Sequence, residues 1–384
     1  MYIWELPDWP YFRWNRDRLL PVLEAAHLKQ GRLFGRMERL GFDLQTNAEL
    51  QAITEEALKS SEIEGEVLDL ATVRSSVARR LGIPDGAIGP EDRRVEGIVE
   101  MTVDATKNFA APVTRQRLFG WQAALFPTGF SGIRRIRVGT WRDDSAGPMQ
   151  VVSLSGPFGR EKVHFQAPPA ARIEAEMEAF LAWFNAPLGL DGIVYAAIAH
   201  LWFVTIHPFE DGNGRIARAL ADMSLARSEN SPQRFYSLSA QIRRERPGYY
   251  ASLESAQKGD LEITERLLWF ADCFTKAIDA AEELCAGVLR KADFWQRHVL
   301  TTLNQRQRKV LNCYLDGFEG KLTAPKWARI AKCSMATAQR DIKELADQGL
   351  LIRNAGGSKN TSYSVAGFDD VNIRTAGAAS GTDS

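Results

Sequence analysis

The stretch His-Pro-Phe-Glu-Asp-Gly-Asn-Gly-Arg-Ile-Ala-Arg at residues 207–218 constrains this chain more than any other segment. A strongly apolar helical pattern at about 191–205 ends at its histidine and proline. A second helical pattern begins around 212–215 and continues to Arg227. The glycines in between permit positive φ angles and the close approach of a ligand to the backbone. The pattern therefore predicts two consecutive helices joined by a tight turn.

The second half of this segment suits a polyphosphate. The amides of Gly212, Asn213 and Gly214 lie at the expected helix N-terminus, where unpaired N–H groups and the helix dipole favour an anion. Arg215 and Arg218, about one helical turn apart, add two guanidinium groups. We therefore predict that these five residues bind the phosphates of a nucleotide.

The first half supplies a base and a cation ligand. His207, with an ordinary pKa of about 6.5, can accept a proton near neutral pH. Asp211 offers the hard oxygen that Mg²⁺ bound to nucleotide phosphates requires. Taken singly, a histidine before proline is usually packed, and Gly-Asn-Gly is usually a simple turn. The combination predicts that His207 deprotonates a Ser, Thr or Tyr hydroxyl, which then attacks the α-phosphorus of ATP.

Residues 207–218 resemble the signature of the Fic family, most of whose members transfer AMP from ATP to protein hydroxyls. The similarity extends over about residues 50–260 and implies ATP as substrate, Mg²⁺ as cofactor and a helical catalytic core. The intact sequence from Gly212 to Arg215 favours AMP transfer over the phosphocholine and kinase-type reactions of some relatives. The resemblance alone suggests a homodimer.

Two further segments are similar to parts of Fic proteins. The alternating pattern at 149–166 predicts a β-hairpin, which resembles the flap on which a target protein docks by strand addition. Tyr249 and Gln257 fall where the family closes on the adenine and ribose. An ordinary surface hairpin and ordinary helix packing are the alternatives. The flap residues expected near the nucleotide are Val163, His164, Phe165 and Gln166.

Residues 60–65, Ser-Ser-Glu-Ile-Glu-Gly, match the inhibitory pattern of the family, in which Ser60, Glu64 and Gly65 are the defining positions. A helix expected near 47–65 puts Glu64 at the negative end of the helix dipole, a cost that a cationic partner would offset. The resemblance implies that this partner is Arg218 and that the glutamate takes the place of the γ-phosphate. The alternative is a solvated glutamate.

Other reactions remain open at the same site. In some relatives the inhibitory glutamate positions water and removes AMP from modified targets. De-AMPylation and phosphotransfer are therefore alternatives to AMP transfer, and a DNA-binding regulator with an ATP-sensing Fic core is the alternative from another functional class.

The composition changes from about Leu303. Helical patterns near 304–316, 323–331 and 334–348 precede two short strand patterns, the order of a winged helix-turn-helix. Within 304–365, eleven Lys and Arg accompany five Asp and Glu, a local excess of +6 in a chain that has 48 of each. A set that could read a DNA groove lies on the third helix: Thr337, Gln339, Arg340 and Lys343. DNA binding and packing against a protein partner both remain open.

The expected fold class is mainly α: a Fic-type helical core with a β-hairpin flap, followed by a C-terminal winged helix-turn-helix domain. The four cysteines form no CxxC pair, which argues against a disulfide framework or a thiolate zinc site. No apolar run is long enough to span a bilayer, and we expect a cytoplasmic protein. The expected parts are an N-terminal helical region at 1–92, a catalytic core at 93–295, the winged helix at 300–366 and a disordered tail at 367–384.

Overall fold

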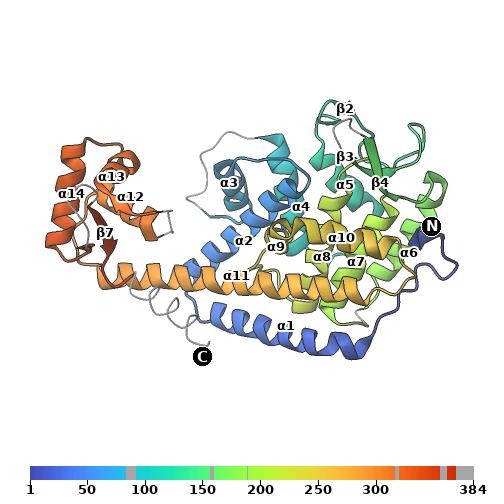
Figure 1. Ribbon diagram of the computed structural model, residues 1–384, viewed down its shortest axis with the longest axis horizontal. Helices are drawn as coiled ribbons and strands as arrows, with labels where there is room; N and C mark the ends of the chain where they lie inside the picture. The colour runs from blue at the N-terminus through green and yellow to red at the C-terminus, as the bar shows by residue number, and fades with distance from the viewer. Residues whose placement is uncertain (84–91, 156–159, 188, 316–319, 355–360, 369–384) are drawn as a thin grey trace. The chain divides into compact units, whose positions relative to one another are not determined.

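The computed structural model describes all residues except 84–91, 156–159, 188, 316–319, 355–360 and 369–384 (Figure 1). The chain divides into two compact units, residues 1–282 and 283–384. This division falls inside one long helix, α11 (Thr264–Arg297), and so differs from the boundary expected between residues 295 and 300. Part of the expected tail lies outside the described residues.

The first unit is mainly helical, as expected, with two small hairpins. In chain order its elements are η1 (Ile3–Glu5), α1 (Arg16–Met37), α2 (Phe42–Ile63), α3 (Leu70–Arg80), α4 (Arg93–Lys107), α5 (Arg115–Leu125), β1 (Phe130–Ser131), β2 (Arg134–Arg135), β3 (Gln150–Ser155), β4 (Arg160–Gln166), α6 (Ala170–Phe184), α7 (Gly192–Ile206), α8 (Asn213–Glu229), α9 (Leu238–Arg244), α10 (Arg246–Gln257) and the start of α11.

Helices α7 and α8 form the centre of this unit. Every residue of α7 is buried, because its sequence is apolar around its whole circumference. It packs along α8, while α2, α4 and α5 contact α8 and α6 contacts α7 (Figure 1). Asp191 starts α7 by accepting hydrogen bonds from the amides of Ile193 and Val194. The turn at 207–213 therefore emerges from the most deeply buried helix pair.

Helix α1 lies beside the first part of α11 (Figure 1). Arg18 pairs with Glu265, and Lys29 pairs with Asp279. Because the partners advance together along both helices, the two helices run in the same direction.

The hairpin expected at 149–166 is confirmed. Strands β3 and β4 are antiparallel, with a bulge at Val151 and Val152. The helix expected near 47–65 begins earlier, at Phe42, with Gly41 at its cap position.

The second unit contains α12 (Gln305–Leu315), β5 (Leu322–Thr323), α13 (Ala324–Ala331), α14 (Met335–Asp347), β6 (Leu351–Arg353) and β7 (Ser362–Val365). The strands form an antiparallel sheet in the order β5-β7-β6. Trp327, Ile342 and Leu345 are buried at the centre of its own core. Strand β5 was not predicted, since two residues carry no readable alternation.

None of the helices in the described parts of the chain is both long and apolar enough to cross a membrane.

Candidate active site

The turn at 207–213 is held closed by Asn213. Its side-chain oxygen accepts a hydrogen bond from the Phe209 amide at 3.0 Å, and its side-chain nitrogen donates to the Phe209 carbonyl at 2.8 Å. Phe209 itself is fully buried. The side chain of Asn213, a residue predicted to bind phosphate, therefore stabilises the shape of the loop.

His207 ends α7 in the left-handed conformation, with φ of 52°. Its Nδ1 lies 3.2 Å from the carbonyl oxygen of Val204. Because a carbonyl can only accept, Nδ1 carries the hydrogen and Nε2 keeps its lone pair. Burial lowers the pKa of His207, and the nearby Arg142 guanidinium lowers it further. The imidazole is therefore neutral near pH 7 and able to accept a proton.

Arg142 fixes the same loop from the other side, a role the sequence did not suggest. Its Nε donates to the His207 carbonyl at 2.8 Å, and its backbone amide donates to the Pro208 carbonyl at 2.9 Å. Its Nη2 donates to the Pro168 carbonyl, just beyond strand β4. The side chain is buried and thereby ties the histidine loop to the base of the flap hairpin.

The first turn of α8 lacks a side-chain cap of its own. Gly212 stands at the cap position with φ of 90° and offers no acceptor. The carboxylate of Glu64 instead lies against this turn, since a Cβ atom at Gly214 would be only 2.2 Å from Glu64 Oε1. An anion from α2 thus occupies the helix N-terminus that the sequence assigns to phosphate.

Arg218 is bound entirely by the end of α2. Its Nε donates to the Ser60 hydroxyl at 2.9 Å, and its Nη2 donates to the Ser60 carbonyl at 2.8 Å. Its Nη1 forms an ion pair with Glu64 Oε1 at 2.9 Å. The arginine side chain is 1% exposed, and Glu64 raises its pKa against the opposing effect of burial. Ser60, Glu64 and Arg218, separated in the sequence, therefore come together.

Arg215 has a carboxylate partner that was not predicted. Its Nη1 lies 2.8 Å from Glu66 Oε2, and its guanidinium group lies over the Phe126 ring at 4.9 Å. Asp211 is more distant, at 3.8 Å. Both arginines of the motif are therefore paired with glutamates from the segment that follows α2.

Asp211 is the residue best suited to a divalent cation. Its side chain is 39% exposed; Oδ1 accepts a hydrogen bond from the Gly212 amide, and Oδ2 accepts one from the Ser131 hydroxyl. Within the described ranges, no three His, Cys, Asp or Glu side chains converge as a metal cage. A single accessible carboxylate still fits Mg²⁺, which takes one or two carboxylates and completes its shell with phosphate oxygens and water.

The four flap residues occupy different environments. Val163 is exposed, whereas Phe165 is buried and packs edge-on against Tyr2. His164 Nδ1 pairs with Glu254 Oε2 of α10 at 2.8 Å. The Gln166 side chain bonds that of Gln150 on the opposite strand at 3.0 Å. Val163 is therefore the member of this set that presents an open surface.

Tyr249 and Gln257 pack into the interior. The Tyr249 hydroxyl lies 3.1 Å from His200 Nε2, and burial raises its pKa to about 12. Gln257 donates to Thr205 on α7 at 3.3 Å. Tyr250, the neighbour of the predicted residue, is part-exposed and donates to the Ile63 carbonyl at the end of α2. The adenine contact predicted for Tyr249 and Gln257 stays a prediction.

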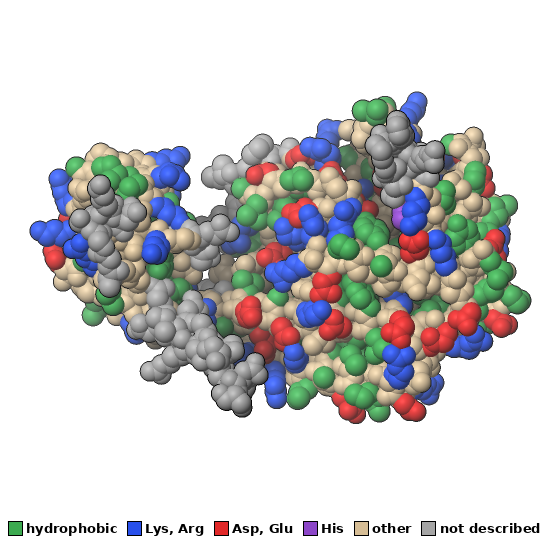
Figure 2. All heavy atoms as spheres, in the orientation of Figure 1, with side chains coloured by type: hydrophobic (Ala, Val, Ile, Leu, Met, Phe, Trp, Pro, Cys, Tyr) green, Lys and Arg blue, Asp and Glu red, His purple; other side chains and the backbone are tan. Residues whose placement is uncertain are grey.

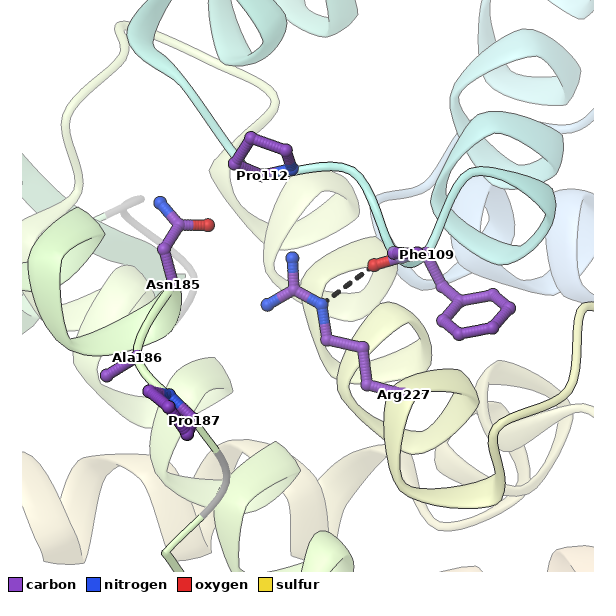
Figure 3. A pocket seen from close by; sticks show the side chains of 7 residues that line it. Phe109, Pro112, Asn185, Ala186, Pro187 and Arg227 are labelled. Carbon is purple, nitrogen blue, oxygen red and sulfur yellow. Dashed lines mark hydrogen bonds between the residues drawn. The ribbon is translucent and has the colours of Figure 1, made fainter.

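A cavity of about 250 Å³ lies away from these residues, between the loops after α4 and α6 (Figure 3). Its charged member, Arg227, donates to the carbonyls of Phe109 and Phe184, both at 2.8 Å. Because the Arg227 guanidinium group is hydrogen-bonded to backbone on both sides of the cavity, it connects the two loops, and we do not assign a second site here.

Sequence comparisons match two parts of the chain. Residues 112–225 match the Fic/DOC family, and residues 2–83 match a domain of unknown function, DUF4172. The protein adenylyltransferase Fic of Aedes aegypti is 28% identical over 69% of this chain and 50% of the relative, and that of Drosophila willistoni is 34% identical over 32% and 24%. This chain thus spans about half the length of the first of these curated relatives.

Two solved structures share the fold. A Fic family protein from Desulfovibrio desulfuricans G20 has a TM-score of 0.51 at 18% identity, covering 90% of this chain and 96% of that one. A Fic domain containing signaling protein from Bacteroides thetaiotaomicron VPI-5482 has a TM-score of 0.50 at 18% identity, covering 69% and 98%. Residues 112–225 therefore match a Fic/DOC domain in sequence, and the first of these structures shows that the fold around them resembles that of Fic proteins.

Proposed function

We propose that this protein transfers AMP from ATP to a hydroxyl side chain of a target protein, and that Glu64 restrains the reaction. The observation that carries this proposal is the Glu64 carboxylate lying on the first turn of α8 and pairing with Arg218. A carboxylate of the protein bound at a helix N-terminus and to an arginine indicates a site that can also bind the phosphates of a ligand. The names of the curated relatives, protein adenylyltransferase Fic, support the same reaction.

In this mechanism His207 acts as the general base. Its Nδ1–H is held by Val204, so Nε2 accepts the proton of a Ser, Thr or Tyr hydroxyl. The hydroxyl oxygen then forms a bond to the α-phosphorus, the bond from that phosphorus to the bridging oxygen breaks, and pyrophosphate leaves. Arg215, Arg218 and the amides that begin α8 stabilise the phosphate charge.

Asp211 would hold Mg²⁺, with Ser131 orienting its carboxylate. The cation, when bound, neutralises charge on the phosphate oxygens. The exposure of Asp211 leaves room for phosphate and water ligands, while Arg134 pairs with the neighbouring Glu210 and keeps that second carboxylate occupied.

Restraint by Glu64 follows from competition for one cation. Arg218 is buried and has its three nitrogens engaged by Ser60 and Glu64. A triphosphate reaches this guanidinium group only when the Glu64 carboxylate leaves it. Replacing Glu64 by glycine removes the competing anion and leaves Ser60 in place.

The test uses ATP labelled at the α- or γ-phosphate with the full-length chain and Mg²⁺. We expect Glu64→Gly to raise α-label incorporation into polypeptide at least tenfold, and a second change, His207→Ala, to lower it by roughly 10²–10⁴-fold. Incorporation of the γ-label instead would assign phosphotransfer. Loss of label from a pre-modified polypeptide, faster with Glu64 present, would assign AMP removal. Equal α-label incorporation with and without His207 would reject the mechanism.

We further propose that the second unit is a winged helix-turn-helix that contacts duplex DNA through α14. Gln339, Arg340 and Lys343 are exposed on this helix. Its acidic neighbour Asp341 is buried and bound by Arg306. Among the charged side chains on the visible face of this unit, Lys and Arg predominate, whereas both signs are interspersed over the first unit (Figure 2). A cationic helix face of this kind favours phosphate contacts.

A further inference from the structure

The segment after α2 ends in a turn that directs two carboxylates to one place. The Gly65 amide donates to the Glu62 carbonyl at 3.1 Å, and the Glu66 amide donates to the Ser61 carbonyl at 3.0 Å. With φ of 87° at Gly65, these bonds form a Schellman motif. The turn reverses the chain within one residue, so Glu64 and Glu66 both face the start of α8.

Each carboxylate binds a different arginine of the 207–218 motif. Glu64 pairs with Arg218 at 2.9 Å, and Glu66 pairs with Arg215 at 2.8 Å. The arginine side chains are 1% and 7% exposed, whereas the glutamates are 32% and 29% exposed. The cations are thus fixed in the protein, and the anions lie on its accessible side, from which they can leave.

We infer that Glu66 is a second inhibitory carboxylate, which withholds Arg215 from the nucleotide as Glu64 withholds Arg218; this rests on the proposed function. A buried guanidinium group that loses its partner anion is strongly destabilised, so an anion that leaves it is best replaced by another. Glu64 and Glu66 supply two anions in the resting state, and the phosphates supply them when the nucleotide binds. Loss of Glu64 alone therefore leaves the site half blocked.

A purely structural ion pair would behave differently. Arg215 also lies over Phe126 and within 3.8 Å of Asp211, so we expect these contacts to hold its position when Glu66 is replaced. Glu66→Gln removes the charge and keeps the shape. It should therefore free Arg215 for phosphate without unfolding the turn.

Glu62 offers a matched control on the same turn. It pairs with Lys59 at 2.7 Å and with Arg243 at 3.5 Å, and touches neither arginine of the motif. Glu62→Gln removes the same charge from the same helix end. Any general effect of reducing negative charge near the site appears equally in this variant.

The experiment measures the Kd of α,β-methylene-ATP, which cannot release pyrophosphate, by calorimetry on the full-length chain with Mg²⁺. In the Glu64→Gly background, Glu66→Gln should lower the Kd about tenfold, as expected for one charge-assisted contact, and Glu62→Gln less than twofold. Thermal unfolding confirms that each variant is folded. The rate of α-label incorporation at low ATP should rise in parallel.

One result would overturn the inference, and a different result would overturn only the proposed function. If Glu66→Gln changes the Kd no more than Glu62→Gln does, Glu66 is a structural partner only, while AMP transfer by Glu64→Gly still upholds the proposed function. If Glu64→Gly binds the nucleotide but transfers no AMP, the proposed function fails, and a tenfold gain from Glu66→Gln still identifies Glu66 as a gate to nucleotide binding.

Discussion

Two arginines at the start of α8 and two basic residues of α14 lie in opposite environments. Arg215 and Arg218 are nearly inaccessible to solvent, and each is paired with a glutamate. Arg340 and Lys343 are exposed, and no ion pair to either is found among the described residues. These cationic groups are therefore paired with fixed anions at the start of α8 and left to solvent on α14.

This difference determines what each set can bind. A buried guanidinium group is already desolvated when its ligand arrives. It therefore binds an anion strongly, but only in one geometry, which makes the site selective. An exposed cation gains little from any single contact, is screened by salt, and acts through the sum of several phosphates. The first set suits one nucleotide, and the second suits a repeating polyanion.

The largest expected effect on AMP transfer comes from replacing a buried arginine of α8. In the Glu64→Gly background, Arg218→Ala should lower α-label incorporation by roughly 10²-fold or more, since a fixed donor to the phosphates is lost. Arg340→Ala in the same background should change incorporation less than twofold. Initial rates at saturating ATP measure both. If both variants lose activity to a similar extent, the arginines of α8 and α14 do not differ in their contribution to AMP transfer.

The second prediction concerns the pH dependence that the buried site imposes on His207. Burial keeps its pKa below the usual value, and Glu64 opposes this by raising it. Since only the neutral imidazole accepts a proton, activity should fall as pH decreases through this pKa, below about pH 6.5. Removing Glu64 should move the fall to still lower pH.

Titration of the His207 ring protons by NMR, in the wild type and in Glu64→Gly, measures this shift directly. His27, which pairs with Asp191 rather than with a residue of the motif, provides an internal control whose pKa should not move between the two proteins. A higher pKa for His207 after loss of Glu64 would contradict the electrostatic coupling.

Sequence reasoning identified residues from short patterns, and the resemblance to Fic proteins supplied their pairing. Ser60, Glu64 and Arg218 were chosen from two short patterns, and the structure brings them together. The hairpin at 149–166 was readable because strand alternation has a strict period of two. Where a contact or a hairpin depended on a pattern within one segment, sequence reasoning named residues that the structure brings together.

Contacts created by packing carried no such signal. Glu66 reaches Arg215 only because Gly65 reverses the chain, and Arg142 reaches the His207 carbonyl from a loop without periodicity. Tyr249 was preferred to Tyr250 on resemblance, although helical position alone cannot tell which neighbour faces the interior. These residues depend on tertiary geometry that no single segment encodes.

The exposed residues of α14, Arg340 and Lys343, predict an effect of intermediate size on the salt dependence of DNA binding. If the second unit binds a duplex, the slope of log K against log salt should become shallower by about 1 for Arg340→Ala and again for Lys343→Ala. A fluorescently labelled duplex titrated at several salt concentrations measures this. Arg215→Ala, which changes a buried cation, should leave the slope unchanged. If neither substitution changes the affinity for the duplex or its salt dependence, α14 is not part of the DNA interface.

The smallest effect is expected at a pair of intermediate exposure, His27 of α1 and Asp191 at the start of α7, whose Nε2 and Oδ2 lie 2.6 Å apart. The Asp191 carboxylate raises the pKa of His27 above its usual value, although burial opposes this. The pair therefore stabilises the fold fully below the unfolded pKa of about 6.5 and loses this contribution as pH rises through the folded value. Because both side chains are partly exposed, His27→Ala should cost no more than about 1 kcal/mol at pH 5.5 and almost nothing at pH 8.5. Urea unfolding at the two pH values measures the difference. If the loss of stability is the same at both pH values, His27 acts through packing and not through its charge. Burial would then be the property that distinguishes the arginines of α8 from this histidine.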